Sequence, residues 1–172
     1  MKRKKLAELG KYYALKPFHG YVMSLKPNIQ PITDLFPPWP LNKWDSKWCA
    51  AFVYFCCRKA GLNLPVRHPS PKVTCNFAGC GAWLQWSILE GFFFKRFDNS
   101  FSPSPGDIVL YDGVFENKPH DHIGIILRST KQTIITAEGN VNNVSMIIKR
   151  PINNHIRGYI RIKENYCFKK EE

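Results

Sequence analysis

The chain of 172 residues is long enough for one domain with a substantial hydrophobic core and too short for two large domains. Its hydrophobic content of 44% and aromatic content of 14% exclude an intrinsically disordered protein. The formal net charge of +12 favours an anionic partner, and nucleic acid, anionic lipid and the acidic polymers of a bacterial cell wall all fit. No zinc-finger, RNA-binding or helix-turn-helix signature accompanies the charge, so charge alone does not predict a nucleic-acid-binding protein.

The sequence opens with a basic cluster, from Lys2 to Lys5, that resembles the start of a signal peptide. Residues 6–11 do not continue into the apolar segment of such a leader, and no apolar run approaches the length that spans a membrane. We therefore expect no membrane span. We also expect either that the protein is made without a Sec-type leader or that the leader has been removed.

Residues 1–43 are predicted to form a basic, proline-rich arm. From Leu6 to Lys16 the apolar residues have helical spacing and predict a short helix that ends at Pro17. Residues 18–44 contain five prolines and several aromatic residues. We expect this part to lie over the domain as an extended segment without regular secondary structure.

The segment from Trp48 to Gly61 is the clearest helix in the sequence and contains a candidate nucleophile. Asp45 and Ser46 are helix-capping residue types just before it, and Gly61 is the residue type that most often ends a helix. Cys49 falls in the first turn, where unpaired backbone N–H groups and the helix dipole favour a thiolate over a thiol. The alternative is a buried structural cysteine, and other parts of the sequence decide between the two.

The sequence contains six cysteines, which could form disulfides, bind a metal or remain thiols. They are Cys49, Cys56, Cys57, Cys75, Cys80 and Cys167. Only Cys75 and Cys80 resemble a pair of metal ligands, and no second pair occurs at zinc-binding spacing. We therefore expect reduced thiols and no zinc site, which is consistent with the expected lack of a leader.

The second half of the chain has the periodicity of β-structure. A loop over residues 62–81 and a short helix over residues 82–90, closed by Gly91, precede it. Short β-branched and aromatic segments then predict six strands, at residues 92–97, 107–111, 122–127, 133–138, 145–150 and 157–162. Because helices come first and strands with short turns follow, we predict an α+β domain with helices packed on an antiparallel sheet of five to six strands.

Two of the predicted strands carry residues that could activate the cysteine. A cysteine nucleophile needs a base, and the base needs a group that holds its tautomer. His122 begins one strand and Glu138 ends the next, so a hairpin with its loop between residues 127 and 133 would bring both to one end of the sheet. Packing the Cys49 helix across that end would align a thiol, an imidazole and a carboxylate, with Asn140 close by.

Each of these residues also has a simpler interpretation. His120 would share a face with His122 on a continuous strand, and either could be the base. We favour His122 because the apolar strand begins directly after it. Glu138 could be a solvated strand end, and Asn140 a turn residue beside Gly139. Because these residues occur together with a cysteine at a helix start, we favour a catalytic set over the simpler interpretations.

Four motifs that occur in order along the chain indicate a family. They are Trp48-Cys49-Ala50-Ala51-Phe52-Val53, Pro105-Gly106-Asp107-Ile108-Val109, Asp121-His122-Ile123-Gly124-Ile125-Ile126 and Glu138-Gly139-Asn140. They resemble the motifs of the CHAP family of cysteine, histidine-dependent amidohydrolases and peptidases. The segment from Ile156 to Arg161 is similar to the last strand of that family. The resemblance predicts a catalytic domain over residues 44–163, followed by a charged tail over residues 164–172.

The resemblance implies a papain-like α+β fold and the hydrolysis of amide bonds. By position it implies Cys49 as the nucleophile, His122 as the general base and then acid, Glu138 as the orienting group and Asn140 as an assisting residue. The backbone N–H of Cys49 would be one oxyanion donor. A second donor from residues 42–47 stays unassigned.

Some members of the family bind calcium through an acidic loop just before the nucleophile. Here that segment offers only Asp45, so we expect no metal and no cofactor. Candidate substrate contacts are Trp44, Trp48 and Asp121, and core packing is the alternative role for the tryptophans.

The resemblance implies bacterial peptidoglycan as the most frequent substrate, cleaved by an N-acetylmuramoyl-L-alanine amidase or an endopeptidase through a thioester. A basic protein would also favour approach to anionic cell-wall polymers. It would be made in the bacterial cytoplasm and reach the wall after release, as a phage lysin does, or by dedicated export. Alternatives are an intracellular amidase acting on a small amide, and a catalytically idle domain that binds cell-wall material or a protein. We expect no nucleic-acid partner, and the oligomeric state stays open.

Overall fold

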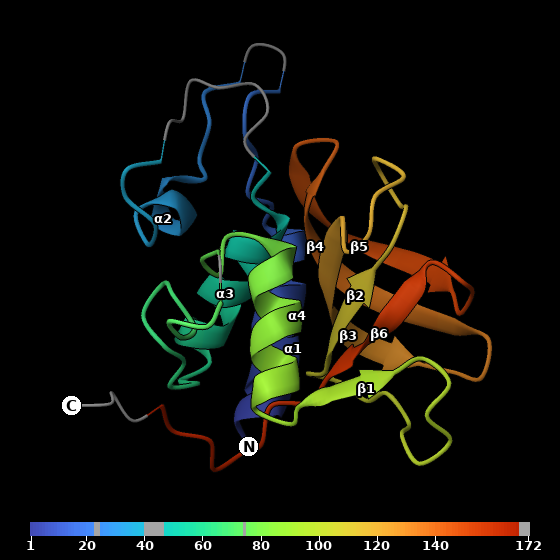
Figure 1. Cartoon of the computed structure of the whole chain (residues 1–172). Helices are drawn as coiled ribbons and strands as arrows, with labels where there is room; N and C mark the ends of the chain where they lie inside the picture. Colours follow the sequence, from blue (N-terminus) through green and yellow to red (C-terminus); the bar gives the residue numbers. More distant parts are fainter. Residues whose placement is uncertain (23–24, 40–46, 74, 169–172) are drawn as a thin grey trace.

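A six-stranded antiparallel sheet forms one layer of the protein, and the longer helices lie along one side of it (Figure 1). The computed structural model describes residues 1–22, 25–39, 47–73 and 75–168. The helices are α1 (Lys2–Leu15), α2 (Gln30–Thr33), α3 (Cys49–Lys59) and α4 (Cys80–Leu89). The strands are β1 (Phe93–Lys95), β2 (Ile108–Tyr111), β3 (His122–Ser129), β4 (Thr133–Val141), β5 (Val144–Pro151) and β6 (Ile156–Ile160). The predicted α+β class is confirmed.

The strand order in the sheet is β1-β6-β2-β3-β4-β5, and every neighbouring pair is antiparallel. Strands β2 to β5 form the meander that short turns predict. Strand β6 returns across the sheet and pairs with both β1 and β2. The proline-rich part of the first 43 residues also differs from the prediction, because one turn of helix, α2, interrupts it.

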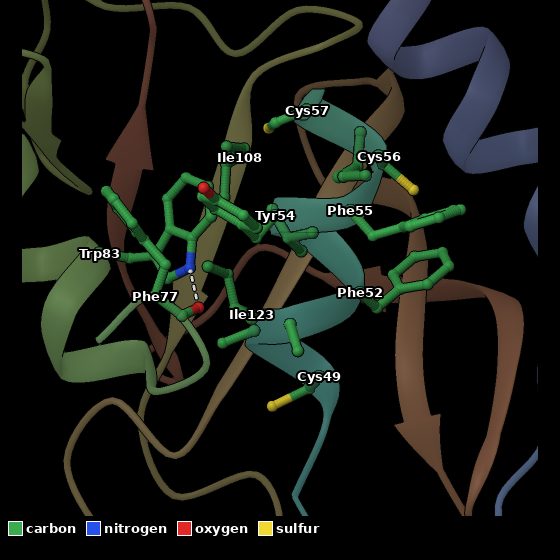
Figure 2. Packing of buried hydrophobic residues seen from close by; sticks show 14 of the residues in the cluster. Cys49, Phe52, Tyr54, Phe55, Cys56, Cys57, Phe77, Trp83, Ile108 and Ile123 are labelled. Atoms are coloured by element: carbon green, nitrogen blue, oxygen red, sulfur yellow. Dashed lines mark hydrogen bonds between the residues drawn. The ribbon is translucent and has the colours of Figure 1, made fainter. Parts of the chain in front are cut away.

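Helix α3 lies at the centre of the hydrophobic core, against β3 and β4. All nine residues from Cys49 to Cys57 are buried, which is the pattern of a helix that is apolar all round. Figure 2 shows the packed rings on both sides of this helix, with Tyr54 and Phe77 on one side and Phe52 on the other. The helix ends as predicted, with Gly61 at a φ of 82°. The capping residues expected before it, at positions 45 and 46, lie outside the described residues.

Helix α1 begins earlier than predicted because a carboxylate from the other end of the chain caps it. Glu164 accepts hydrogen bonds from the backbone N–H groups of Lys2, at 2.6 Å, and Arg3, at 3.3 Å. These N–H groups have no partner inside the helix, so the distant carboxylate replaces a local capping residue. The buried Leu6 then packs in the same hydrophobic cluster as α3, and α1 lies against β3, β4 and β5. The predicted arm, residues 1–43, thus contributes a helix to the core.

The buried carboxylate of Asp107, directly before β2, joins three parts of the chain. Its oxygens accept hydrogen bonds from Arg3 Nη1 at 3.0 Å and from Arg161 Nη2 at 2.6 Å. The backbone N–H of Ser104 donates a further bond at 2.8 Å. The side chain of Asp107 is 0% exposed, whereas the two arginines are 20% and 31% exposed. This ion-pair cluster fixes the start of α1 and the residue after β6 to the start of β2.

Asp107→Ala is expected to lower the free energy of unfolding by about 3 kcal/mol, because it leaves two arginines close together without their shared carboxylate. Urea denaturation followed by tryptophan fluorescence measures the change. Asp98→Ala is the control, because Asp98 accepts its hydrogen bonds from Ser100 in an exposed surface turn. We expect it to change the free energy of unfolding much less. Equal effects of the two substitutions would contradict the role assigned to Asp107.

Candidate active site

The structure brings His122 and Glu138 into direct contact on neighbouring strands. Strands β3 and β4 form the predicted hairpin, and the backbone N–H of Thr130 bonds the carbonyl of Thr133 in its turn. His122 Nε2 lies 2.9 Å from Glu138 Oε2. Both side chains are buried, at 2% and 0% exposure, so water does not weaken their interaction.

The Glu138 carboxylate has more partners than the sequence predicts. Arg150 Nε and Nη2 donate to its two oxygens, at 2.7 and 2.6 Å. The hydroxyl groups of Thr136 and Tyr111 donate to Oε1, at 2.6 and 3.2 Å. The guanidinium of Arg150 also lies over the ring of Tyr111, 5.0 Å from its centroid. A buried carboxylate needs such a set of donors, because an unpaired buried charge is strongly unfavourable.

Cys49 is the first residue of α3 and lies at the same end of the sheet. Its side chain is 5% exposed, and the neighbouring His122 imidazole helps to lower the pKa of its thiol. Figure 2 shows Cys49 at the start of the helix, with its sulfur directed away from Phe52. A second thiol is in contact with it, because Cys80 Sγ lies 3.8 Å from Cys49 Sγ. The sequence gives no sign of this contact, since the two cysteines are 31 residues apart.

These contacts favour the charged forms of the three candidate groups. Hydrogen bonds from Cys80 and His122 lower the pKa of the Cys49 thiol to about 5, although burial opposes this. Burial also opposes the charge on His122, but hydrogen bonds with Cys49 and Glu138 raise the pKa of the imidazole to about 9. Burial likewise opposes the charge on Glu138, but Arg150 and His122 lower the pKa of the carboxyl group to about 2. At neutral pH the site is therefore a thiolate–imidazolium pair beside an ionised carboxylate.

Two glycines in the sequence motifs give this site its close packing. A Cβ atom on Gly139 would lie 2.6 Å from Phe52 Cβ, so only glycine lets β4 approach α3 at this distance. A Cβ atom on Gly124 would lie 2.8 Å from Glu138 Cγ, so glycine leaves the space that the carboxylate side chain occupies. Gly139 therefore sets the close approach of β4 to α3, and Gly124 leaves room for Glu138 between β3 and β4.

The other polar candidates lie near this set without joining it. Asn140 follows Glu138 at an irregularity of β4, with a φ of 60°, and its side chain has no hydrogen bond to the three groups among the described residues. His120 lies in the turn before β3 with a φ of 40°, so it is not on a continuous strand with His122 as assumed above. Asp121 accepts hydrogen bonds from the backbone N–H groups of residues 114–116 and thereby shapes the loop before β3.

Trp48, one of the two tryptophans predicted to contact substrate, is fully buried. Its indole Nε1–H donates to Asn143 Oδ1 at 3.0 Å, and its ring packs on Phe52. Burial assigns Trp48 to the core. The other tryptophan candidate, Trp44, lies outside the described residues, and so do residues 42–46 of the segment expected to supply a second oxyanion donor.

Within residues 1–22, 25–39, 47–73 and 75–168, no group of three or more histidine, cysteine or acidic side chains is arranged to hold a metal ion. Asp45, the acidic residue before the nucleophile, lies outside these ranges. No helix in the described part of the chain is both long and apolar enough to cross a bilayer.

An α+β fold that places a cysteine at a helix start near a buried histidine hydrogen-bonded to a carboxylate has the arrangement on which cysteine hydrolases depend. The family model of the CHAP domain matches residues 41–140, which is 100 of the 172 residues. The chain therefore belongs to the CHAP domain family, and this membership implies amidohydrolase or peptidase activity. Comparison with curated proteins gives no match, and comparison with solved structures gives none either. Arg150 lies beyond the matched residues, so the family match does not reveal it.

Alkylation of Cys49 by iodoacetamide is expected to accelerate as the pH rises through about 5, because the thiolate is the reactive form. For an ordinary cysteine the same rise in alkylation rate occurs at about pH 8.5. The rate is measured by peptide mass spectrometry from about pH 4 to about pH 10, a range that includes the pKa of an ordinary cysteine. Glutathione is the reference thiol. His122→Ala should move the rise of the profile to higher pH. A wild-type profile that coincides with that of glutathione would contradict the ion pair.

Arg150→Met is expected to lower the free energy of unfolding by about 3 kcal/mol, because it leaves the Glu138 carboxylate buried without its bidentate cation. The same change raises the pKa of Glu138. It should therefore move the acid limb of the Cys49 alkylation profile to higher pH, since a protonated Glu138 no longer stabilises the His122 imidazolium. Arg150→Lys keeps the charge and should restore part of both effects.

Arg157→Met is the matched control for Arg150→Met. Arg157 pairs with Asp112 at the surface, where the two side chains are 38% and 31% exposed, so we expect a small change in stability and none in the alkylation profile. If the two arginine variants shift the profile equally, Arg150 has no specific role in positioning the site.

Proposed function

We propose that this protein is a cysteine hydrolase that cleaves amide bonds in bacterial peptidoglycan, as an N-acetylmuramoyl-L-alanine amidase or as an endopeptidase. The observation that carries the proposal is the buried contact between His122 and Glu138, beside a thiol whose pKa is lowered. Domains of the matching family generally act on peptidoglycan. The net charge of +12 supports a substrate embedded in anionic polymers, because it attracts the protein to them.

In the proposed reaction, the Cys49 thiolate attacks the amide carbonyl carbon and forms a tetrahedral oxyanion. The backbone N–H of Cys49, at the open start of α3, is suited to bond this oxyanion. His122 then gives its proton to the leaving amine, the C–N bond breaks, and a thioester remains. Water attacks the thioester while His122 takes up a proton, and the C–S bond breaks to release the acid and the thiolate.

Glu138 is proposed to hold the His122 ring in one orientation and to stabilise its charged form through both steps. Arg150 acts behind it as a positioning residue, because its two hydrogen bonds leave the carboxylate little freedom to rotate. The order of groups away from the substrate is therefore sulfur, imidazole, carboxylate and guanidinium.

Purified peptidoglycan incubated with the wild-type protein is expected to release fragments, and Cys49→Ala should reduce their release to the background level. Mass spectrometry of the fragments identifies the bond: freed glycan strands indicate an amidase, and new amino termini within the peptide indicate an endopeptidase. Cys57→Ala is the matched control. It removes a buried cysteine from the far end of the same helix (Figure 2) and should retain activity if the protein stays folded.

Circular dichroism of both variants shows whether they are folded. Equal cleavage by Cys49→Ala and the wild type would contradict the assignment of the nucleophile. Binding to the wall without cleavage by the wild type would overturn the proposed substrate and favour a binding domain or an amidase with another substrate.

A further inference from the structure

Cys80 has no part in the proposed reaction, yet its side chain touches the proposed nucleophile. The two sulfur atoms are 3.8 Å apart, and the two residues are 8% and 5% exposed. Cys80 is the first residue of α4, as Cys49 is of α3, so the positive ends of two helices lie at the sulfur pair. Both helix starts favour negative charge on sulfur.

We propose that Cys49 and Cys80 form a reversible disulfide when the protein meets a hydroperoxide, so that Cys80 is the resolving thiol for an oxidised Cys49. The chemical part of this inference depends only on the two thiols. Its consequence, reversible loss of hydrolase activity, rests on the proposed function.

The geometry requires little movement. A disulfide bond is about 2.0 Å long, so the sulfurs must approach by about 1.8 Å, the difference between 3.8 and 2.0 Å. Rotation between staggered rotamers moves a cysteine sulfur farther than this. Cys56 and Cys57, in contrast, lie at the other end of α3 (Figure 2), and Cys167 is exposed in the C-terminal segment.

In the first step the Cys49 thiolate attacks one oxygen of the hydroperoxide ROOH. The S–O bond forms and the O–O bond breaks, so that Cys49 becomes a sulfenic acid and RO⁻ leaves, taking one proton from water to become ROH. In the second step the Cys80 sulfur attacks the Cys49 sulfur. The S–S bond forms and the S–O bond breaks, and hydroxide leaves as water with the proton of Cys80. A dithiol reductant restores both thiols and is itself oxidised to a disulfide.

The electrostatics of the pair favour this order of events. In the resting site the hydrogen bond to Cys49, followed by burial, raises the pKa of Cys80, so Cys80 is a thiol while Cys49 is the thiolate. Cys49 is then the sulfur that meets the oxidant. Once Cys49 is a neutral sulfenic acid, the neighbouring negative charge is gone and Cys80 can lose its proton more easily. Oxidation of the first thiol therefore activates the second.

The test treats the reduced, full-length protein with hydrogen peroxide and measures intact mass, thiol content in denaturant, and disulfide-linked peptides. The wild type is expected to lose the mass of two hydrogen atoms and to fall from the six thiols of the sequence to four, because one disulfide consumes two. Non-reducing peptide mapping should recover the Cys49–Cys80 pair. Dithiothreitol should restore six thiols, alkylation at Cys49 and any peptidoglycan cleavage.

Cys80→Ser and Cys80→Ala should instead accumulate sulfinic and sulfonic acids at Cys49, which dithiothreitol does not reverse. Two variants guard against misfolding of one, and circular dichroism checks both. Cys75→Ser removes another thiol near the start of α4, and Cys167→Ser removes an exposed one. We expect both to behave as the wild type.

Recovery of Cys49 linked to Cys75, or reversible oxidation that persists in both Cys80 variants, would overturn the inference. So would irreversible oxidation of Cys49 in the wild type. A Cys49–Cys80 disulfide in a protein that does not cleave peptidoglycan would support the inference and count only against the proposed substrate.

Discussion

The buried carboxylate of Glu138 is the constraint on which the site depends. Moving an ionised carboxylate out of water is unfavourable by several kcal/mol, so it is tolerated only with good hydrogen-bond donors on all sides. Here the donors come from four strands: Tyr111 on β2, His122 on β3, Thr136 on β4 and Arg150 on β5. The Glu138 carboxylate therefore connects strands β2 to β5. A shift in the register of these strands would leave this carboxylate without its donors.

The charges of the site alternate along a line, from the Cys49 thiolate through the His122 imidazolium and the Glu138 carboxylate to the Arg150 guanidinium. The two inner groups each lie between two opposite charges, and the two outer groups each lie beside one. The four charges sum to zero. The hydrogen bond from Cys80 and the neighbouring imidazolium together explain how a nucleophile that is 5% exposed can be ionised at rest. Arg150 is the partly exposed end of the line, at 19% exposure, so its charge is shared with solvent and need not be balanced further.

Patterns local in the sequence predicted most of the fold and three of these four charged groups. The helix with Cys49 in its first turn, the hairpin of β3 and β4, and the contact of His122 with Glu138 all follow from periodicity and turn residues. Arg150 does not, because it pairs across the sheet with Ile134, and the residue opposite Glu138 is Met146. Only the length of the arginine side chain lets it reach the carboxylate along the sheet. A long side chain that contacts a residue not paired with it in the sheet leaves no periodic pattern in the sequence. The same holds for contacts between distant parts of the chain, such as the capping of α1 by Glu164.

The contact of Cys80 with Cys49 was not predicted for a related reason. A contact between the first residues of two helices depends on how the helices pack, and not on the spacing of the residues in the chain. The same packing has two chemical consequences. Hydrogen bonding and helix dipoles that stabilise the Cys49 thiolate make it a better nucleophile toward an amide carbonyl. They make it equally a better nucleophile toward a peroxide oxygen, because the same lone pair attacks in both reactions. The site that ionises Cys49 therefore also makes it susceptible to oxidation. Cys80, which lies beside Cys49, is placed to form a disulfide with the oxidised sulfur.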